Sequence, residues 1–246
     1  MQVAGLLLRY KPGFLASEQA AIVTELCSLT KPEAAKGKDQ QRSTLVAEAA
    51  VRSLGASCVS ALPHPQHGTV VETLLKTSEA KSLELNMTTA LALCMVAAGP
   101  CSKASADPNF PTELDSTVLH SVANEQTGAM TVAVLEDWCR STKAAHRHAA
   151  GVWLECVLRN NGHLETVQEL LPRVQQAFIE LLGEGNDITQ SLASTGLSLC
   201  YENGTGAMKE QLVAMLVDTL SHGKRSKVAG LFSLWYGLLA THPVLL

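Results

Sequence analysis

Histidines are the side chains of this sequence whose spacing comes closest to a metal site. His146 and His148 stand two residues apart, so on a helix they point to different sides, whereas two ligands on one helical face need a spacing of three or four. His64 and His67 flank Pro65 in a predicted loop, and no further ligand is placed beside them. A zinc ion takes at least three protein ligands. The sequence therefore predicts no metal site, and we expect His146 and His148 on the surface.

Nucleophiles and phosphate-binding loops give no stronger signal. Most of the seven cysteines stand in apolar surroundings, as Cys94 and Cys200 do, and no two form a C-x-x-C pair. A thiol there behaves as a small hydrophobe, and this odd number favours a reduced, intracellular compartment. The sequence has no glycine-rich phosphate loop, no G-x-S-x-G elbow and no paired-carboxylate motif. We therefore expect no catalytic, cofactor-binding or metal-binding residue, no cofactor and no enzymatic activity.

Two tryptophans, Trp138 and Trp153, fall on consecutive predicted helices. We interpret them as core between repeats rather than as a ligand box. The alternative is an exposed aromatic anchor for a partner.

The elements that position these residues are predicted to be helices. Hydrophobic residues make up 46% of the 246 residues and aromatic residues only 4%, and a core rich in Leu, Ala and Val suits helices better than sheets. The formal charge of −4 leaves no basic footprint for nucleic acid, so nucleic-acid binding is disfavoured.

The clearest helix begins near Leu164. Its apolar residues recur every three or four positions, which places them on one helical face. Pro172 inside this pattern predicts a kink or a restart. These apolar residues are Val167, Leu171, Val174, Phe178 and Leu181.

A second helix follows the break at residues 183–185. Asp187 and Gln190 fit a capping box, which predicts the start of the helix, and Gly204 predicts its end. We expect one face to carry Ile188, Leu192, Ala193, Gly196, Leu199 and Cys200.

Small residues in the middle of this helix call for a physical reason. Glycine in a helix interior costs about 1 kcal/mol relative to alanine, so a partner helix must need the space at Ala193 and Gly196. Two antiparallel helices of this kind form one HEAT-type unit, and we expect another helix from Thr205 to about Gly223.

Weaker copies of the unit precede it. Three alanine-bearing segments end at glycines 55, 99 and 162, and two of the three spacings between equivalent alanines match the period of about 40 to 47 residues of HEAT and armadillo repeats. The longer spacing contains a predicted insertion loop at about 99–115, and shorter breaks are expected at 31–41 and 63–68. The equivalent alanines are Ala50, Ala90, Ala150 and Ala193. The sequence thus predicts an all-α fold, a HEAT/armadillo-type α-solenoid of stacked antiparallel helix pairs over residues 1–227.

The last residues, 228–246, form a divergent apolar tail. Their apolar run ends at Ala240 and is shorter than the roughly 20 residues that span a membrane. We expect a last packed helix or a non-native chain end, and a membrane anchor is the alternative.

Residues 149–227 resemble the proteasome adaptor and scaffold proteins of eukaryotes, very large HEAT-repeat proteins also called proteasome stabilisers. The most specific stretch is QSLASTGLSLCYE at 190–202, and GVWL at 151–154 and LLPRVQ at 170–175 support it. Those family members are several times longer, and they continue as polar repeats where this sequence turns apolar. We therefore expect a fragment or a short gene product.

This resemblance implies a non-enzymatic protein of the ubiquitin–proteasome pathway, in the cytoplasm and nucleus. Its partners would be subunits of the 26S proteasome, whose core and regulatory particles it would help to hold together and to link to other machinery. The alternatives are a HEAT-repeat scaffold of another assembly and a protein tethered to a membrane by its tail. We further expect exposed solenoid ends to cause self-association.

Overall fold

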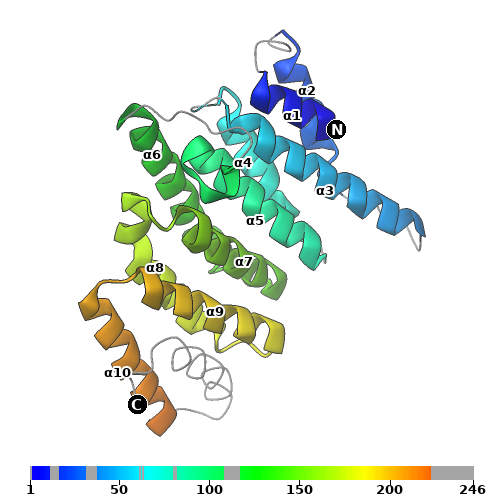
Figure 1. Cartoon of the computed structure of the whole chain (residues 1–246). Helices are drawn as coiled ribbons and strands as arrows, with labels where there is room; N and C mark the ends of the chain where they lie inside the picture. Colours follow the sequence, from blue (N-terminus) through cyan, green and yellow to red (C-terminus); the bar gives the residue numbers. More distant parts are fainter. Residues whose placement is uncertain are drawn as a thin grey trace. The chain divides into compact units, whose positions relative to one another are not determined.

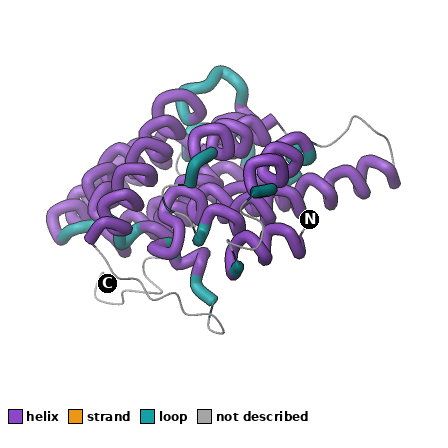
Figure 2. Tube along the Cα trace, turned by 90° about the horizontal axis from the view of Figure 1, so that it is seen from above, coloured by secondary structure: helices purple, strands orange, loops and turns teal. Residues whose placement is uncertain are grey.

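The structure is a computed structural model that describes residues 2–11, 17–31, 38–60, 62, 64–79, 82–107 and 117–222. These residues form helices joined by turns, and no strand occurs among them (Figures 1 and 2). The chain divides into two compact units, residues 1–132 and 133–246. Each unit is described by itself.

In unit 1, α1, α3 and α5 run parallel to one another. A Cβ atom added at Gly5 of α1 would meet the Ser53 backbone of α3 at 2.8 Å, and further along Ser60 Oγ donates to the Leu8 carbonyl at 2.8 Å. A Cβ atom added at Gly55 of α3 would meet Ala92 of α5 at 2.9 Å. The helices are α1 (Gln2–Tyr10), α2 (Gln19–Ser28), α3 (Lys38–Cys58), α4 (His67–Leu75), α5 (Leu83–Ala98) and α6 (Thr117–Ala133).

Unit 2 opens with a π-helical turn, η5 (Val134–Trp138), and continues as antiparallel hairpins. Its helices are α7 (Ala144–Asn161), α8 (Glu165–Leu181), α9 (Asp187–Asn203) and α10 (Gly206–His222). Helices α7 and α9 lie side by side in parallel (Figure 1), because His148 meets Thr189, 41 residues later, and Gly151 meets Leu192 at the same offset. That offset falls within the predicted repeat period.

The predicted core is confirmed. All five apolar residues of the first predicted helix are buried on α8, and Ala50, Ala90, Ala150 and Ala193 are at most 1% exposed on α3, α5, α7 and α9. The predicted all-α fold class, with stacked antiparallel helix pairs, is therefore correct within each unit. The division into repeats over 1–227 and a tail stays a prediction, because residues 223–246 lie outside the described residues.

Gly196 has the role that its sequence position predicts. A Cβ atom at Gly196 would lie well under 3.0 Å from three ring atoms of Phe178 on α8, and Phe178 is fully buried. The missing side chain lets α9 approach α8 in the antiparallel pair.

Two predictions for the start of α9 are wrong. The N-cap is Asn186, whose side chain accepts hydrogen bonds from the backbone N–H groups of Ile188 and Thr189, and not Asp187. The Gln190 side chain instead donates to the Glu184 carbonyl at 2.6 Å. Ile188 is 62% exposed, whereas the next residue, Thr189, is buried and meets His148 of α7, so Ile188 lies on the solvent side of the first turn.

Pro172 does not restart its helix, as α8 runs unbroken from Glu165 to Leu181. Leu171 and Val174 are buried on either side of it, whereas Pro172 is exposed. Tertiary packing therefore holds the helix across the hydrogen bond that the proline cannot donate.

Several boundaries also differ from the prediction. Helix α3 begins at Lys38, inside the expected break, and it continues past Gly55 to Cys58, because Gly55 is a contact glycine rather than an end. The expected insertion begins with ordered 3-10 turns after Gly99, whose φ is 52°. Arg9 of α1 donates to the Ser105 carbonyl there.

One described segment, Leu83–Cys101, is long and apolar enough by length and composition to cross a membrane. Of its most apolar stretch, 67% is buried inside the fold, so its hydrophobic residues serve mainly as the core of unit 1. The other candidate, the predicted tail, lies outside the described residues.

Candidate functional site

His146 and His148 are half-buried, so the expectation that they lie on the surface is wrong. His148 Nδ1 lies 3.0 Å from Thr189 Oγ1 on α9, and His146 Nδ1 lies 3.2 Å from Ser141 Oγ. Burial lowers the pKa of His148, which favours its neutral ring. His148 therefore helps to join two stacked helices.

His64 and His67 lie at the start of α4 in unit 1. The Gln66 backbone N–H donates to His64 Nδ1 at 3.1 Å, and Gln19 Nε2 of α2 lies 3.0 Å from His64 Nε2. Burial lowers the pKa of both histidines. His64 is only 3% exposed, so it acts as a satisfied core residue.

The described residues contain no group of three or more His, Cys, Asp or Glu side chains that could hold a metal ion. The two histidine pairs are in different units.

The tryptophans pack on each other in unit 2. Their ring centroids lie 6.0 Å apart with a tilt of 53°, and Trp153 is 1% exposed. The π-helical turn η5 brings Trp138 to this contact on the side of α7. The core interpretation is therefore correct for Trp153, while Trp138 is half-buried.

Three of the cysteines are poor nucleophiles. Burial raises the pKa of the Cys58, Cys139 and Cys200 thiols to about 12. Because the thiolate is the reactive form, these thiols are inert near neutral pH.

An ion pair that the sequence did not predict joins α7 to the turn after α8. Arg147 Nε and Nη2 donate to the two carboxylate oxygens of Glu184 at 2.6 and 3.0 Å, and Arg147 Nη1 donates to the Ser141 carbonyl at 2.7 Å. This hydrogen bonding lowers the pKa of Glu184. Arg147 and Glu184 are 37 positions apart, so their contact could have been predicted only from the way in which one helix pair stacks on the next.

A shallow groove of about 270 Å³ runs between the end of η5 and α8. Beside it, Arg173 Nη2 lies 3.0 Å from Glu136 Oε1. Its lining mixes apolar atoms with both signs of charge: Leu135, Cys139, Arg140, Pro172, Arg173, Gln176, Ala177 and Glu180. Such a surface can contact a peptide, and the thiol in its lining, Cys139, has a pKa raised to about 12, first by burial and then by the nearby Glu180 carboxylate.

Together these features define a class. Within each unit the described residues form stacked helix pairs, several polar side chains join one helix to the next, and the grooves on the surface are shallow. Proteins of this architecture present extended surfaces to other macromolecules.

The comparisons with known proteins agree with that class. No family model matches the chain. It is 32% identical over 181 residues to the human "Proteasome adapter and scaffold protein ECM29", covering 73% of this chain and 10% of that protein. It is 28% identical over 158 residues to the Saccharomyces cerevisiae "Proteasome component ECM29", covering 61% of this chain and 8% of that protein. A Drosophila melanogaster "Proteasome-associated protein ECM29 homolog" is 34% identical over 79 residues, which is 32% of this chain and 4% of that protein.

The resemblance found in the sequence is thus confirmed: this chain is similar to a segment of the ECM29 proteasome adaptor and scaffold proteins. The chain spans about a tenth or less of the length of these relatives.

Two residues in the stretches that carry the resemblance are packing residues. A Cβ atom added at Gly151 would lie 2.9 Å from Leu192 and 3.0 Å from Leu181, and one added at Gly196 would meet the ring of Phe178.

Proposed function

We propose that this chain is part of a non-enzymatic adaptor or scaffold that associates with the proteasome. The observation that carries the proposal is its similarity to three proteins that are named as proteasome adaptor, component or associated protein. The stacked helices support it, since such a fold offers contact surface without a deep pocket.

In its finer form the proposal concerns the 26S proteasome. The chain would contact subunits of the core and regulatory particles, help to hold these particles together, contribute to proteasome assembly and link the proteasome to other machinery in the cytoplasm and nucleus. The predicted HEAT character supports this form, because repeats stacked in register can follow a large partner.

Affinity purification of the tagged chain from eukaryotic cells tests the association. We expect core and regulatory subunits among the recovered proteins, from both cytosolic and nuclear fractions. Two variants accompany the wild type. Gly196→Leu would disrupt the packing of unit 2 against Phe178. Its matched control, Ile188→Glu, changes a 62% exposed side chain without disturbing the core.

Recovery of proteasome subunits with the wild type and with Ile188→Glu, but not with Gly196→Leu, supports the proposal. A folded chain that recovers no proteasome subunits above the tag alone contradicts it. Consistent recovery of a different large assembly would instead identify a scaffold of that assembly.

A further inference from the structure

Helix α5 exposes apolar residues along one side. Leu83, Met87 and Leu91 follow one another at intervals of four, so they lie along one face of the helix, and they are 44%, 55% and 46% exposed. Their neighbours Leu85 and Leu93 are buried in the core of unit 1. A helix that is apolar on all sides is normally covered on all sides, so this row of side chains is suited to a partner.

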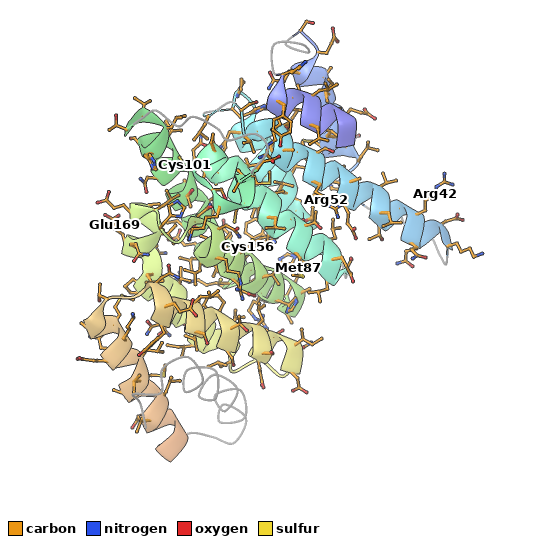
Figure 3. All side chains as sticks on the ribbon, in the orientation of Figure 1. Arg42, Arg52, Met87, Cys101, Cys156 and Glu169 are labelled. Carbon is orange, nitrogen blue, oxygen red and sulfur yellow. The ribbon has the colours of Figure 1, made fainter. Side chains whose placement is uncertain are left out.

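The neighbouring helix extends this surface. Leu45 of α3 is 58% exposed, and it lines the same groove as Leu83, a groove of about 720 Å³ between the first turns of α3 and α5. Figure 3 labels Met87 on α5 and Arg52 on α3, and these two helices pack against each other. The groove is lined by Gln40, Gln41, Thr44, Leu45, Glu48, Ser82, Leu83 and Glu84.

The charge of the groove is negative. Among the residues that the structure describes, its lining includes two carboxylates, Glu48 and Glu84, and no basic side chain. Arg52 lies outside the lining, 3.8 Å from Glu48 and with its own side chain 59% exposed, so it neutralises Glu48 only weakly. Glu84 is exposed and accepts a hydrogen bond from Ser82 Oγ at 3.2 Å.

This combination selects one kind of occupant. An anionic lipid surface and a nucleic acid would both be repelled by the two glutamates. A second copy of the surface would bring the same glutamates to the contact. A helix with basic residues beside its apolar side chains complements both features.

We propose that Leu45, Glu48, Leu83, Glu84, Met87 and Leu91, the α3–α5 surface, bind a basic amphipathic helix of a partner protein. Apolar side chains of that helix, spaced by three or four residues, pack on Leu83, Met87 and Leu91, as in other helix-in-groove contacts. Its Lys or Arg side chains face Glu48 and Glu84. Met87 lies at the centre of the row, where an unbranched thioether can adapt to different apolar partners.

The test measures peptide binding to the purified full chain. The probe is a fluorescent amphipathic peptide of about 16 residues made of Leu and Lys, and a second peptide has the same Leu positions with Glu in place of Lys. The variants are Met87→Glu and Glu84→Lys. The matched control is Val118→Glu, which changes a 68% exposed apolar residue of α6 in the same unit.

We expect the Leu/Lys peptide to bind the wild type and Val118→Glu equally, and to bind Met87→Glu and Glu84→Lys about tenfold more weakly. The Leu/Glu peptide should show no measurable binding. Circular dichroism should be unchanged, because the substituted side chains are exposed.

Three results would overturn the proposal: equal binding of the two peptides, equal weakening by Val118→Glu, or no binding of the Leu/Lys peptide at about 100 µM. A dimer that Met87→Glu converts to a monomer in light scattering would also overturn it, because a second copy would then cover the surface. The measurement contains no proteasome, so its failure leaves the proposed proteasome association standing.

Discussion

Replacing Gly196 by alanine tests the packing that defines unit 2. The added Cβ would lie well under 3.0 Å from the Phe178 ring, and carbon atoms in ordinary contact are about 3.5–4.0 Å apart. The ring must therefore move by roughly 1 Å. Phe178 is fully buried, so it cannot turn toward solvent to make this room.

Two effects of opposite sign decide the outcome. Alanine gains about 1 kcal/mol over glycine in a helix interior, whereas overpacking a core typically costs about 1–3 kcal/mol. A displacement this large in a buried ring places the cost in the upper part of that range. We expect Gly196→Ala to lower the free energy of unfolding of unit 2 by about 1–2 kcal/mol.

Urea unfolding followed by tryptophan fluorescence measures this change. Trp138 and Trp153 pack on each other in unit 2, so their fluorescence reports that unit. With a slope of about 1–3 kcal/mol per molar urea, the midpoint should fall by roughly 0.5–1 M. The matched control is Gly206→Ala on α10, where no atom lies within 4 Å of an added Cβ, and this variant should be at least as stable as the wild type.

A double mutant isolates the cause. In a Phe178→Leu background the smaller side chain leaves room for the new methyl group, so Gly196→Ala should become neutral or stabilising. The reasoning is refuted if Gly196→Ala stabilises the wild type, or if its effect is the same with Phe and with Leu at position 178.

Four further predictions follow from the contacts of the two units. Arg147→Ala should lower the free energy of unfolding by about 1–2 kcal/mol, because it removes a charge-assisted bidentate pair with Glu184; Arg147→Lys should restore only part of it in the same urea assay. Burial lowers the pKa of His64. The contribution of His64 to stability is therefore complete above the usual pKa of about 6.5 and is lost as pH falls from there toward the lowered pKa. The urea midpoint should drop between about pH 7.5 and 5.5, His64→Asn should make this drop smaller, and an unchanged drop would contradict the reasoning. Native Cys58 and Cys200 should react with iodoacetamide at pH 8 far more slowly than in urea, since burial raises the pKa of each thiol to about 12, and mass spectrometry of labelled peptides measures the rates. The isolated chain should self-associate at micromolar concentration, and a stable monomer in light scattering would refute that expectation.

The periodic part of this fold could be predicted because packing depends on residue size along one face. The five apolar residues of α8 and the alanines of α3, α5, α7 and α9 are buried where a period of 3.6 places them. Gly196 was informative for the same reason. A glycine that destabilises a helix indicates that another residue packs into the space of the missing side chain, and here that residue is Phe178.

Helix ends were harder to predict because several residues compete for the same role. Asn186, Asp187 and Gln190 all carry groups that can cap a helix, and the contact of Gln190 with Glu184 in the preceding turn decides between them. Gly55 has the sequence context of a helix end, but its contact with Ala92 keeps it inside α3. Such contacts join residues of different helices, so a local pattern does not contain them.

The exposed surface illustrates why function is the least predictable level in this class of protein. Four leucines of α5 have different environments: Leu85 and Leu93 are buried, whereas Leu83 and Leu91 are exposed. The difference depends on which side of α5 meets α3 and α4, a property of the stack rather than of the helix. A surface that crosses from α3 to α5 unites residues about 40 positions apart, so it exists only once the repeats are in register. Gly151 and Gly196 face neighbouring helices, so they indicate how the helices pack but not which partner the exposed surface binds.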